Sequence, residues 1–369
     1  GESMRAENHG YIDSGYLLIA DISGFTSFIA NTELDHAQAI LQQVLGGLID
    51  KLTPTMTLCE VEGDAVFVYG LTDRLSRGEL VAELVESTYA SFRDQQRTMI
   101  RNATCPCQAC RAIDRLDLKF VVHHGEFVLQ ELAGKTGPVG SSVNLVHALL
   151  KNQVSEQTGW QGYVMFTTQA LAQMGIPSDG MHQGAEHHEH LGTSVTYSTN
   201  LRPRYEAMCE TRRFFLDGKD AHVEVVRDVD APRPIVWDWL NDTDKRTRWT
   251  PANWEVTTRP GGRTGPRASN HCATFNVIEY ILDWRPFDYY TVRLTRGGMD
   301  LLITVCLEEL EQGTRMRWRM KVELPLPRWL LEKIALFIIR RRMHLQTSLD
   351  ELERLVLERG SDIPAAIQA

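Results

Sequence analysis

The chain has 369 residues, 43% of them hydrophobic and 24% charged, with a net charge of −9. A single core rarely grows beyond about 250–300 residues, so this length predicts more than one domain. The composition is that of a folded protein, and its acidic balance argues against a general nucleic-acid-binding protein. No apolar run approaches the roughly 20 residues of a transmembrane segment. Seven cysteines in a chain this long favour reduced thiols and a cytoplasmic protein.

Two structured segments are expected, 15–200 and 218–360, joined by a linker over 201–217. The linker is rich in arginine and has weak periodicity. Residues 1–14 are interpreted as a tag remnant and N-terminal tail, and residues 361–369 as a C-terminal tail.

The first segment alternates strand and helix patterns. In chain order these are a buried strand over 16–22, a helix over 40–52, a hairpin of 57–61 and 65–69, a helix over 79–101, a second hairpin of 116–122 and 126–132, and a helix over 143–150. This order predicts an α+β domain with helices covering a sheet.

The second segment begins with an alternating strand over 221–229 and a short helix over 235–240. Further strands are expected over 271–281, 289–295, 301–307 and 315–322, and a long helix over 327–357. This order predicts a curved antiparallel sheet wrapped around a C-terminal helix.

Two acidic residues lie where strands end. Asp21 follows the first strand, and Asp64 lies at the tip of the next hairpin. If these strands pair, the carboxylates converge, and such oxygen ligands suit Mg²⁺ beside a phosphate. The turn Ser23-Gly-Phe-Thr26 opens a helix whose N–H groups could face phosphate oxygens. In isolation, each acidic motif is more typical of a helix cap or a turn than of a metal site.

Four motifs together resemble the class III nucleotidyl cyclase homology domain, which has a ferredoxin-like fold. They are Ala20-Asp-Ile-Ser-Gly-Phe-Thr26, Glu62-Gly-Asp-Ala-Val-Phe67, Leu118-Lys-Phe-Val-Val-His-His-Gly125 and Gly140-Ser-Ser-Val-Asn-Leu145. The resemblance covers about 15–200 and points to an uncharacterised bacterial branch. It implies two Mg²⁺ or Mn²⁺ ions and a nucleoside triphosphate. The residues it implies are Asp21, Ile22 and Asp64 for the metals, Lys119, Phe25 and Thr26 for the nucleotide, Glu60 for base selection and Asn144 for the transition state.

The chain departs from this pattern at the arginine position, at the second base-selecting position and at the family's late lysine, which has no clear match around 191–197. The family's catalytic arginine position, four residues after Asn144, holds Ala148, and Lys151 is the candidate substitute one turn further on. Losing such a donor typically costs about 10²–10³ in rate. The second base-selecting position is Gly137. Because the family's sites are split between two subunits, the resemblance also implies a homodimer.

A cysteine cluster, Cys105-Pro-Cys-Gln-Ala-Cys110, is predicted to lie in a loop between a helix and a strand. Three thiolates at this spacing suit a soft metal such as Zn²⁺ in a structural role. The candidate fourth ligands are His123, His124 and Cys209. The competing interpretation is three reduced thiols or a labile disulfide. Histidines 182, 187, 188 and 190 are interpreted as a solvated loop, with metal ligation as the alternative. The resemblance to the cyclase domain places that family's last hairpin at His190-Leu-Gly192.

The second segment resembles the START-like or polyketide-cyclase-like superfamily, with a helix-grip fold. The resemblance rests on Val223-Glu-Val-Val-Arg-Asp-Val-Asp-Ala-Pro232, Val236-Trp-Asp-Trp-Leu240, Trp249-Thr-Pro251, Gly313-Thr-Arg-Met-Arg-Trp318 and the closing helix. It implies an apolar cavity for a hydrophobic molecule or lipid. The candidate lining residues are Trp237, Trp239, Trp249, Trp254, Phe275, Trp284, Phe287 and Trp318, at least half of them expected to be ordinary core, and polar candidates are His271 and Cys272.

The closing helix is apolar from 329 to 339 and is followed by three arginines. This pattern fits a buried helix better than contact with an anionic membrane.

Three functions remain open. The first is a signalling enzyme that forms a cyclic nucleotide and pyrophosphate, with the START-like domain sensing a hydrophobic ligand. The second is a catalytically degenerate cyclase-fold protein for binding or dimerisation, coupled to a lipid-binding module. The third places chemistry in the START-like cavity, where no acid–base pair stands out. Ala148 favours the second, and the pair Asp21 and Asp64 favours the first.

Overall fold

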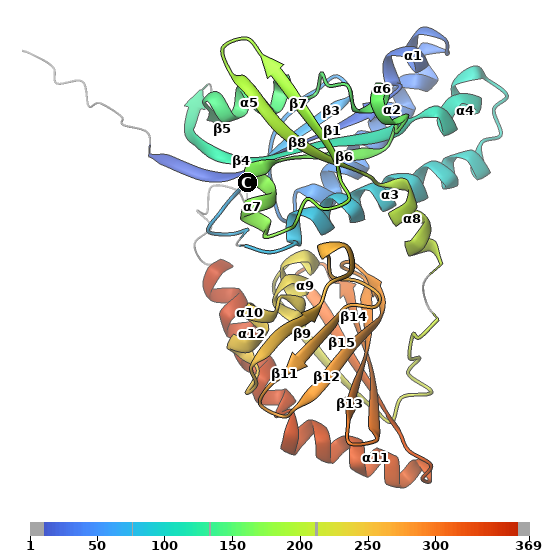
Figure 1. The fold of residues 1–369 in the computed structure, drawn as a ribbon. Coiled ribbons are helices and arrows are strands. Elements are labelled where there is room, and N and C mark those ends of the chain that lie inside the picture. The colour runs from blue at the N-terminus through green and yellow to red at the C-terminus, as the bar shows by residue number, and fades with distance from the viewer. Residues whose placement is uncertain (1–10, 76, 133, 211–212, 361–369) are drawn as a thin grey trace, which may run out of the picture. The chain divides into compact units, whose positions relative to one another are not determined.

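The computed structural model describes residues 11–75, 77–132, 134–210 and 213–360, which form two compact units. The first unit ends at Arg204 and the second begins at Tyr205, except that Gly78–Leu84 group with the second. Both units mix helices and strands, as the α+β prediction requires (Figure 1). The predicted end segments 1–10 and 361–369 lie outside the described residues. Strand β1 begins at Ile12, so residues 12–14 belong to a sheet and not to a tail.

An eight-stranded sheet is the centre of the first unit (Figure 1). Its order is β2-β3-β1-β4-β6-β8-β7, with β5 paired to β4, and its neighbours are antiparallel except for β4 and β6. The strands are β1 (Ile12–Ser23), β2 (Thr57–Glu62), β3 (Ala65–Leu71), β4 (Asp117–Leu132), β5 (Lys135–Val139), β6 (Tyr163–Thr167), β7 (His182–His188) and β8 (Gly192–Asn200).

Helices connect and cover these strands. They are α1 (Phe25–Ala30), α2 (Leu34–Leu52), α3 (Leu80–Asn102), α4 (Gln108–Ala112), α5 (Ser141–Ala148), α6 (Val154–Thr158), α7 (Thr168–Met174) and α8 (Arg202–Cys209). Leu17 and Ile19 of β1 share a core with Val146 and Leu149 at α5. The alternate residues of β1 are fully buried as well, which confirms the predicted buried strand and explains its nearly continuous apolar run.

The second predicted hairpin of this unit is wrong. Residues 117–132 form one continuous strand, β4, and the glycine read as a turn lies in its middle. A Cβ at Gly125 would meet Ser142 Oγ at 2.4 Å and His123 Nε2 at 2.7 Å. Residue 125 must therefore be glycine because α5 packs closely on the strand. The strand itself ends at Leu132.

The segment predicted as a linker contains a helix. Helix α8 occupies Arg202–Cys209, with Tyr205 and Met208 buried. Thr211 and Arg212 lie outside the described residues.

A seven-stranded antiparallel sheet, in the order β10-β11-β12-β13-β14-β15-β9, forms the second unit. Its strands are β9 (Val223–Val229), β10 (Trp254–Thr258), β11 (Ser269–Cys272), β12 (Val277–Arg285), β13 (Tyr289–Arg296), β14 (Met299–Glu309) and β15 (Thr314–Glu323). The single strand predicted over 271–281 is divided into β11 and β12 by a turn in which Asn276 has a φ of 50°. Asparagine tolerates this left-handed conformation better than most residues.

Four helices accompany this sheet: α9 (Arg233–Asn241), α10 (Thr243–Trp249), α11 (Arg328–Phe337) and α12 (Leu345–Gly360). The single closing helix predicted over 327–357 is interrupted. A π-helical turn occupies Ile338–Arg342, and His344 has a φ of 46°, a conformation that no continuous helix contains.

Candidate functional sites

Three of the predicted site residues meet at one end of the central strand β1. Asp21 pairs in register with Ala65 on β3 and with Lys119 on β4. Asp64 immediately precedes β3, and its backbone carbonyl accepts a hydrogen bond from the Ile22 amide at 3.2 Å. Antiparallel pairing of these strands thus brings residues 21, 64 and 119 to the same edge of the sheet.

Charge dominates this group, which we call the acidic site (Asp21, Asp64 and Lys119). Lys119 Nζ lies 3.1 Å from Asp21 Oδ2 and donates to the Leu150 carbonyl at 3.4 Å. Burial raises the pKa of Asp21 although Lys119 opposes the rise. Burial and the negative charge of Asp21 both raise the pKa of Asp64. The two carboxylates therefore repel each other, and such a pair of hard oxygen ligands fits a divalent cation such as Mg²⁺.

The other nucleotide-site residues do not join this group within one chain. Phe25 and Thr26 begin α1, a helix of six residues that follows Gly24, where φ is 83°. The Phe25 ring stacks on Phe28, with 6.2 Å between centroids. Glu60 on β2 and Asn144 on α5 are both exposed.

Lys151 does not lie one helical turn beyond Ala148, because α5 ends at that alanine. The Asn152 side chain explains the stop. Its Nδ2 donates to the Leu149 carbonyl at 2.8 Å, and its Oδ1 accepts from the Val154 amide at 3.0 Å. These local bonds compete with the helical ones. Lys151 is exposed in the turn that follows the helix.

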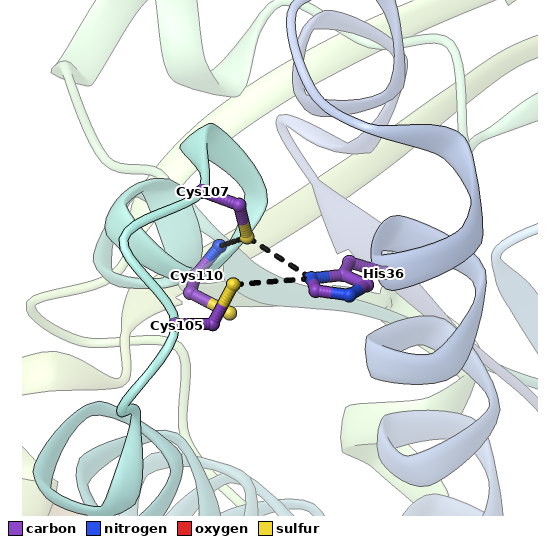
Figure 2. A group of neighbouring side chains, drawn as sticks. All are labelled: His36, Cys105, Cys107 and Cys110. Carbon is purple, nitrogen blue, oxygen red and sulfur yellow. Dashed lines mark hydrogen bonds between the residues drawn. The ribbon is translucent and has the colours of Figure 1, made fainter.

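A second group of functional side chains surrounds the three cysteines (Figure 2). Cys105, Cys107 and Cys110 come from the loop and short helix α4, and His36 reaches them from the first turns of α2. The four ligand atoms all lie within 4.8 Å of one another. A backbone hydrogen bond from Cys110 and the neighbouring His36 lower the pKa of the Cys107 thiol to about 7. We call these four residues the thiol–imidazole cluster.

The sequence reasoning missed His36 and pointed to three other residues. His123 is buried with its Nδ1 2.8 Å from Thr167 Oγ1, and burial lowers its pKa to about 4. His124 Nε2 lies 2.8 Å from Thr72 Oγ1. Cys209 is exposed on α8. A histidine about 70 residues from a cysteine cluster gives no spacing signal; only its place near the start of a helix could have drawn notice.

The remaining histidines of interest belong to the hairpin of β7 and β8. His182 Nε2 contacts Gln157 Oε1 at 2.9 Å, and His187 Nδ1 contacts Thr193 Oγ1 at 3.0 Å. His190 lies in the turn, with a φ of 69°. The stretch is therefore part of a two-stranded hairpin, as the family resemblance implied, and not the solvated loop that its polar composition indicated.

A cavity of about 390 Å³ lies within the second unit. It is bounded by β12 to β15 and by the closing helices, and apolar side chains make up most of its wall. Arg246 and Glu279 line it too, joined by two hydrogen bonds of 2.8 Å each. The Arg246 guanidinium also lies 3.6 Å from the centre of the Trp254 ring.

Four of the eight aromatic residues proposed for this cavity line it: Trp249, Trp254, Phe275 and Trp318. The others pack elsewhere in the core; Trp237 stands edge-on to Trp284, with ring centroids 4.7 Å apart. Cys272 also lines the cavity, whereas His271 contacts Asn276.

The closing helix is buried on one face only. Leu331 and Ala335 are buried, whereas Trp329 and Phe337 are exposed. Among the described residues, no helix has both the length and the apolar character needed to cross a membrane.

Two segments of the chain match models of known protein families. Residues 220–356 match the family model described as polyketide cyclase / dehydrase and lipid transport. This match lies within the C-terminal unit. Residues 41–158 match a model described as a protein of unknown function, DUF2652.

Individual relatives cover parts of the chain. An uncharacterized protein of Mycobacterium tuberculosis is 32% identical over 114 residues, which is 31% of this chain, and the match spans about half, 52%, of that protein. The guanylyl cyclase Cya2 is 18% identical, with a TM-score of 0.39, over 51% of this chain and 92% of its own. The adenylyl cyclase CyaB of P. aeruginosa is 14% identical, with a TM-score of 0.38, over 56% of this chain and 100% of its own.

Proposed function

We propose that the N-terminal unit binds a nucleoside triphosphate together with Mg²⁺ or Mn²⁺ at the acidic site. The observation that carries this proposal is the meeting of Asp21, Asp64 and Lys119 at one edge of the sheet. It agrees with the order of the four cyclase-like motifs in the sequence.

In this proposal each residue has a defined task. Asp21 and Asp64 would hold the cations together with Ile22, whose amide donates a hydrogen bond to the Asp64 carbonyl. Lys119 is ion-paired with Asp21 and would become available to a phosphate oxygen once a cation neutralises that carboxylate. The bound cations would polarise the phosphate and favour attack by a ribose hydroxyl.

Ala148 supplies no positive charge to the transition state, and Lys151 lies outside the helix. We therefore expect the protein to bind the nucleotide but to cyclise it slowly. A degenerate cyclase-fold protein for binding or dimerisation is the alternative. Glu60 and Asn144 are exposed, as residues that complete a partner subunit's site in a homodimer would be.

Binding and product formation distinguish these functions. The purified 369-residue chain is incubated with ATP or GTP and Mn²⁺, and bound nucleotide, cyclic product and pyrophosphate are measured for wild type and Asp64→Ala. Glu62→Gln, an exposed acidic residue of the same hairpin, is the matched control. Product that is lost in Asp64→Ala supports an enzyme, and Asp64-dependent binding without product supports the degenerate protein. Binding that is absent, or unchanged in Asp64→Ala, contradicts both.

We also propose that the C-terminal unit binds a hydrophobic small molecule or lipid in its cavity. The volume of about 390 Å³ lies within the range of small-molecule sites. The Arg246–Glu279 pair gives a mostly apolar wall a charged, hydrogen-bonded point that could orient a ligand's polar end.

A bulky substitution inside the cavity tests this proposal. Val292 is buried on the cavity wall, and Val292→Trp should weaken binding of a fluorescent fatty-acid analogue at least about tenfold, since added volume occupies the ligand's space. Val226→Trp, at an exposed position on β9, is the control. Equal affinity in both variants, with circular dichroism showing both folded, would place the ligand elsewhere.

A further inference from the structure

The thiol–imidazole cluster has the dimensions of a tetrahedral metal site. His36 Nδ1 lies 3.1 Å from Cys107 Sγ and 3.7 Å from Cys105 Sγ. With Zn–S bonds of about 2.3 Å and Zn–N bonds of about 2.0 Å, tetrahedral geometry separates ligand atoms by roughly 3.5–3.8 Å. The four atoms, all within 4.8 Å of one another, need only small shifts to reach such a geometry.

A hydrogen bond within the loop fixes Cys107 relative to Cys110. Cys107 is the N-cap of α4, and its sulfur accepts a hydrogen bond from the Cys110 amide at 3.4 Å. Such an amide-to-sulfur bond favours a thiolate, which is the form that binds metal.

A carboxylate fastens the same loop to α2. The two oxygens of Glu33, the N-cap of α2, accept hydrogen bonds from the amides of Gln108 and Ala109 at 3.2 and 3.1 Å. His36 lies one turn further along α2. Two helix starts that are distant in sequence are thus held together before any ion binds.

We propose that His36 Nδ1 and the thiolates of Cys105, Cys107 and Cys110 bind one Zn²⁺ ion in a closed structural site. Three thiolates and one imidazole form a soft donor set of the Cys₃His type, and four protein ligands leave no position for substrate or water. Each cysteine gives up its thiol proton when the ion binds.

The ion would cross-link the segment around 105–110 to the start of α2. The chain between Asp21 and His36 contains the turn at Gly24 and helix α1. Ser23 pairs in register with Asp117, a few residues beyond the cysteines. Strand pairing would therefore hold one end of the segment that carries Phe25 and Thr26, and the zinc site would hold the other. Zinc binding does not require nucleotide binding. The zinc proposal and the nucleotide proposal can therefore fail separately.

A disulfide is the competing use of these thiols. All seven cysteines are thiols in the structure, the three of the cluster included. A pair such as Cys107 and Cys110 would become a disulfide only by losing two electrons to an oxidant, whereas zinc binding requires none.

Metal content and spectroscopy of the full chain test the proposal. Protein purified under reducing conditions should contain about one Zn²⁺ per chain. Exchange for Co²⁺ should give the intense visible bands and sulfur-to-cobalt charge transfer of a tetrahedral thiolate site. His36→Ala should lose most of the metal, whereas His190→Ala, an exposed hairpin histidine, should keep it.

A conservative variant guards against a simple folding defect. His36→Cys replaces the imidazole with a fourth thiolate, so it should retain the metal and shift the cobalt charge-transfer spectrum. Cys209→Ser, outside the cluster, should resemble wild type. The proposal is overturned if reduced, folded wild type takes up neither ion, if His36→Ala binds Co²⁺ with an unchanged spectrum, or if mass mapping of fresh protein finds a Cys107–Cys110 disulfide.

Discussion

Asp21 and Asp64 form a pair of neighbouring carboxylates at the end of a buried strand. The apolar residues before Asp21 hold it at the end of β1, and the hairpin places Asp64 beside it. Burial and mutual repulsion make the ionised pair unfavourable without a cation, although Lys119 relieves part of the charge on Asp21. The site is therefore maintained at some cost in stability.

Removing one charge should reveal that cost. The pKa of Asp64 is raised in the folded protein, so its carboxylate destabilises the fold increasingly as the pH rises above the ordinary aspartate pKa, and fully above the raised pKa. Asp64→Asn should thus increase the melting temperature at neutral pH in the presence of EDTA. The difference from wild type should shrink as the pH falls toward the ordinary aspartate pKa of 3.8.

Differential scanning fluorimetry across this pH range measures the effect, and Glu62→Gln on the exposed hairpin is the control. A variant that is less stable than wild type at neutral pH would show that Asp64 is not strained by its neighbours.

At the level of elements, close packing accounts for the main error in the predicted topology. The helices and strands with clear periodicity, such as α2, α3 and β1, are confirmed by the structure. The glycine at 125 was ambiguous because a turn and a tight helix–strand contact both require a residue without a side chain. Only the position of Ser142 on α5 distinguishes the two.

This packing can be tested with one methyl group. Gly125→Ala should lower the free energy of unfolding by about 1–3 kcal/mol, because the new Cβ overlaps Ser142 and His123. Gly137→Ala, on the adjacent strand β5, is the matched control, since a Cβ there meets nothing within 4 Å. Urea denaturation of both variants gives the difference. Equal stability of the two would mean that α5 does not press on β4.

The whole molecule combines two units, each with its own sheet and its own candidate ligand. The acidic site belongs to the first unit and the cavity to the second. Each ligand therefore stabilises, by mass action, the unit that binds it.

Calorimetry of the full chain should separate the two effects. A nucleoside triphosphate with Mn²⁺, or a fatty acid, each at about 100 times its dissociation constant, should stabilise its own unit by about 2.7 kcal/mol. The two ligands should shift different parts of the unfolding profile. Asp64→Asn should abolish only the nucleotide shift and Val292→Trp only the fatty-acid shift. Loss of both shifts in either variant would contradict separate sites.

Periodicity and strand-end chemistry in the residue order were enough to predict two α+β units, the convergence of Asp21 and Asp64, and a loop that carries three cysteines. These features depend on neighbours within a few residues or on pairing between adjacent strands. The fold was needed to supply His36, to make β4 continuous, to end α5 before Lys151 and to interrupt the closing helix at His344. Each of these depends on side chains that are distant in the chain or on hydrogen bonds that compete with a helix, and neither leaves a repeating pattern for a reader of the sequence.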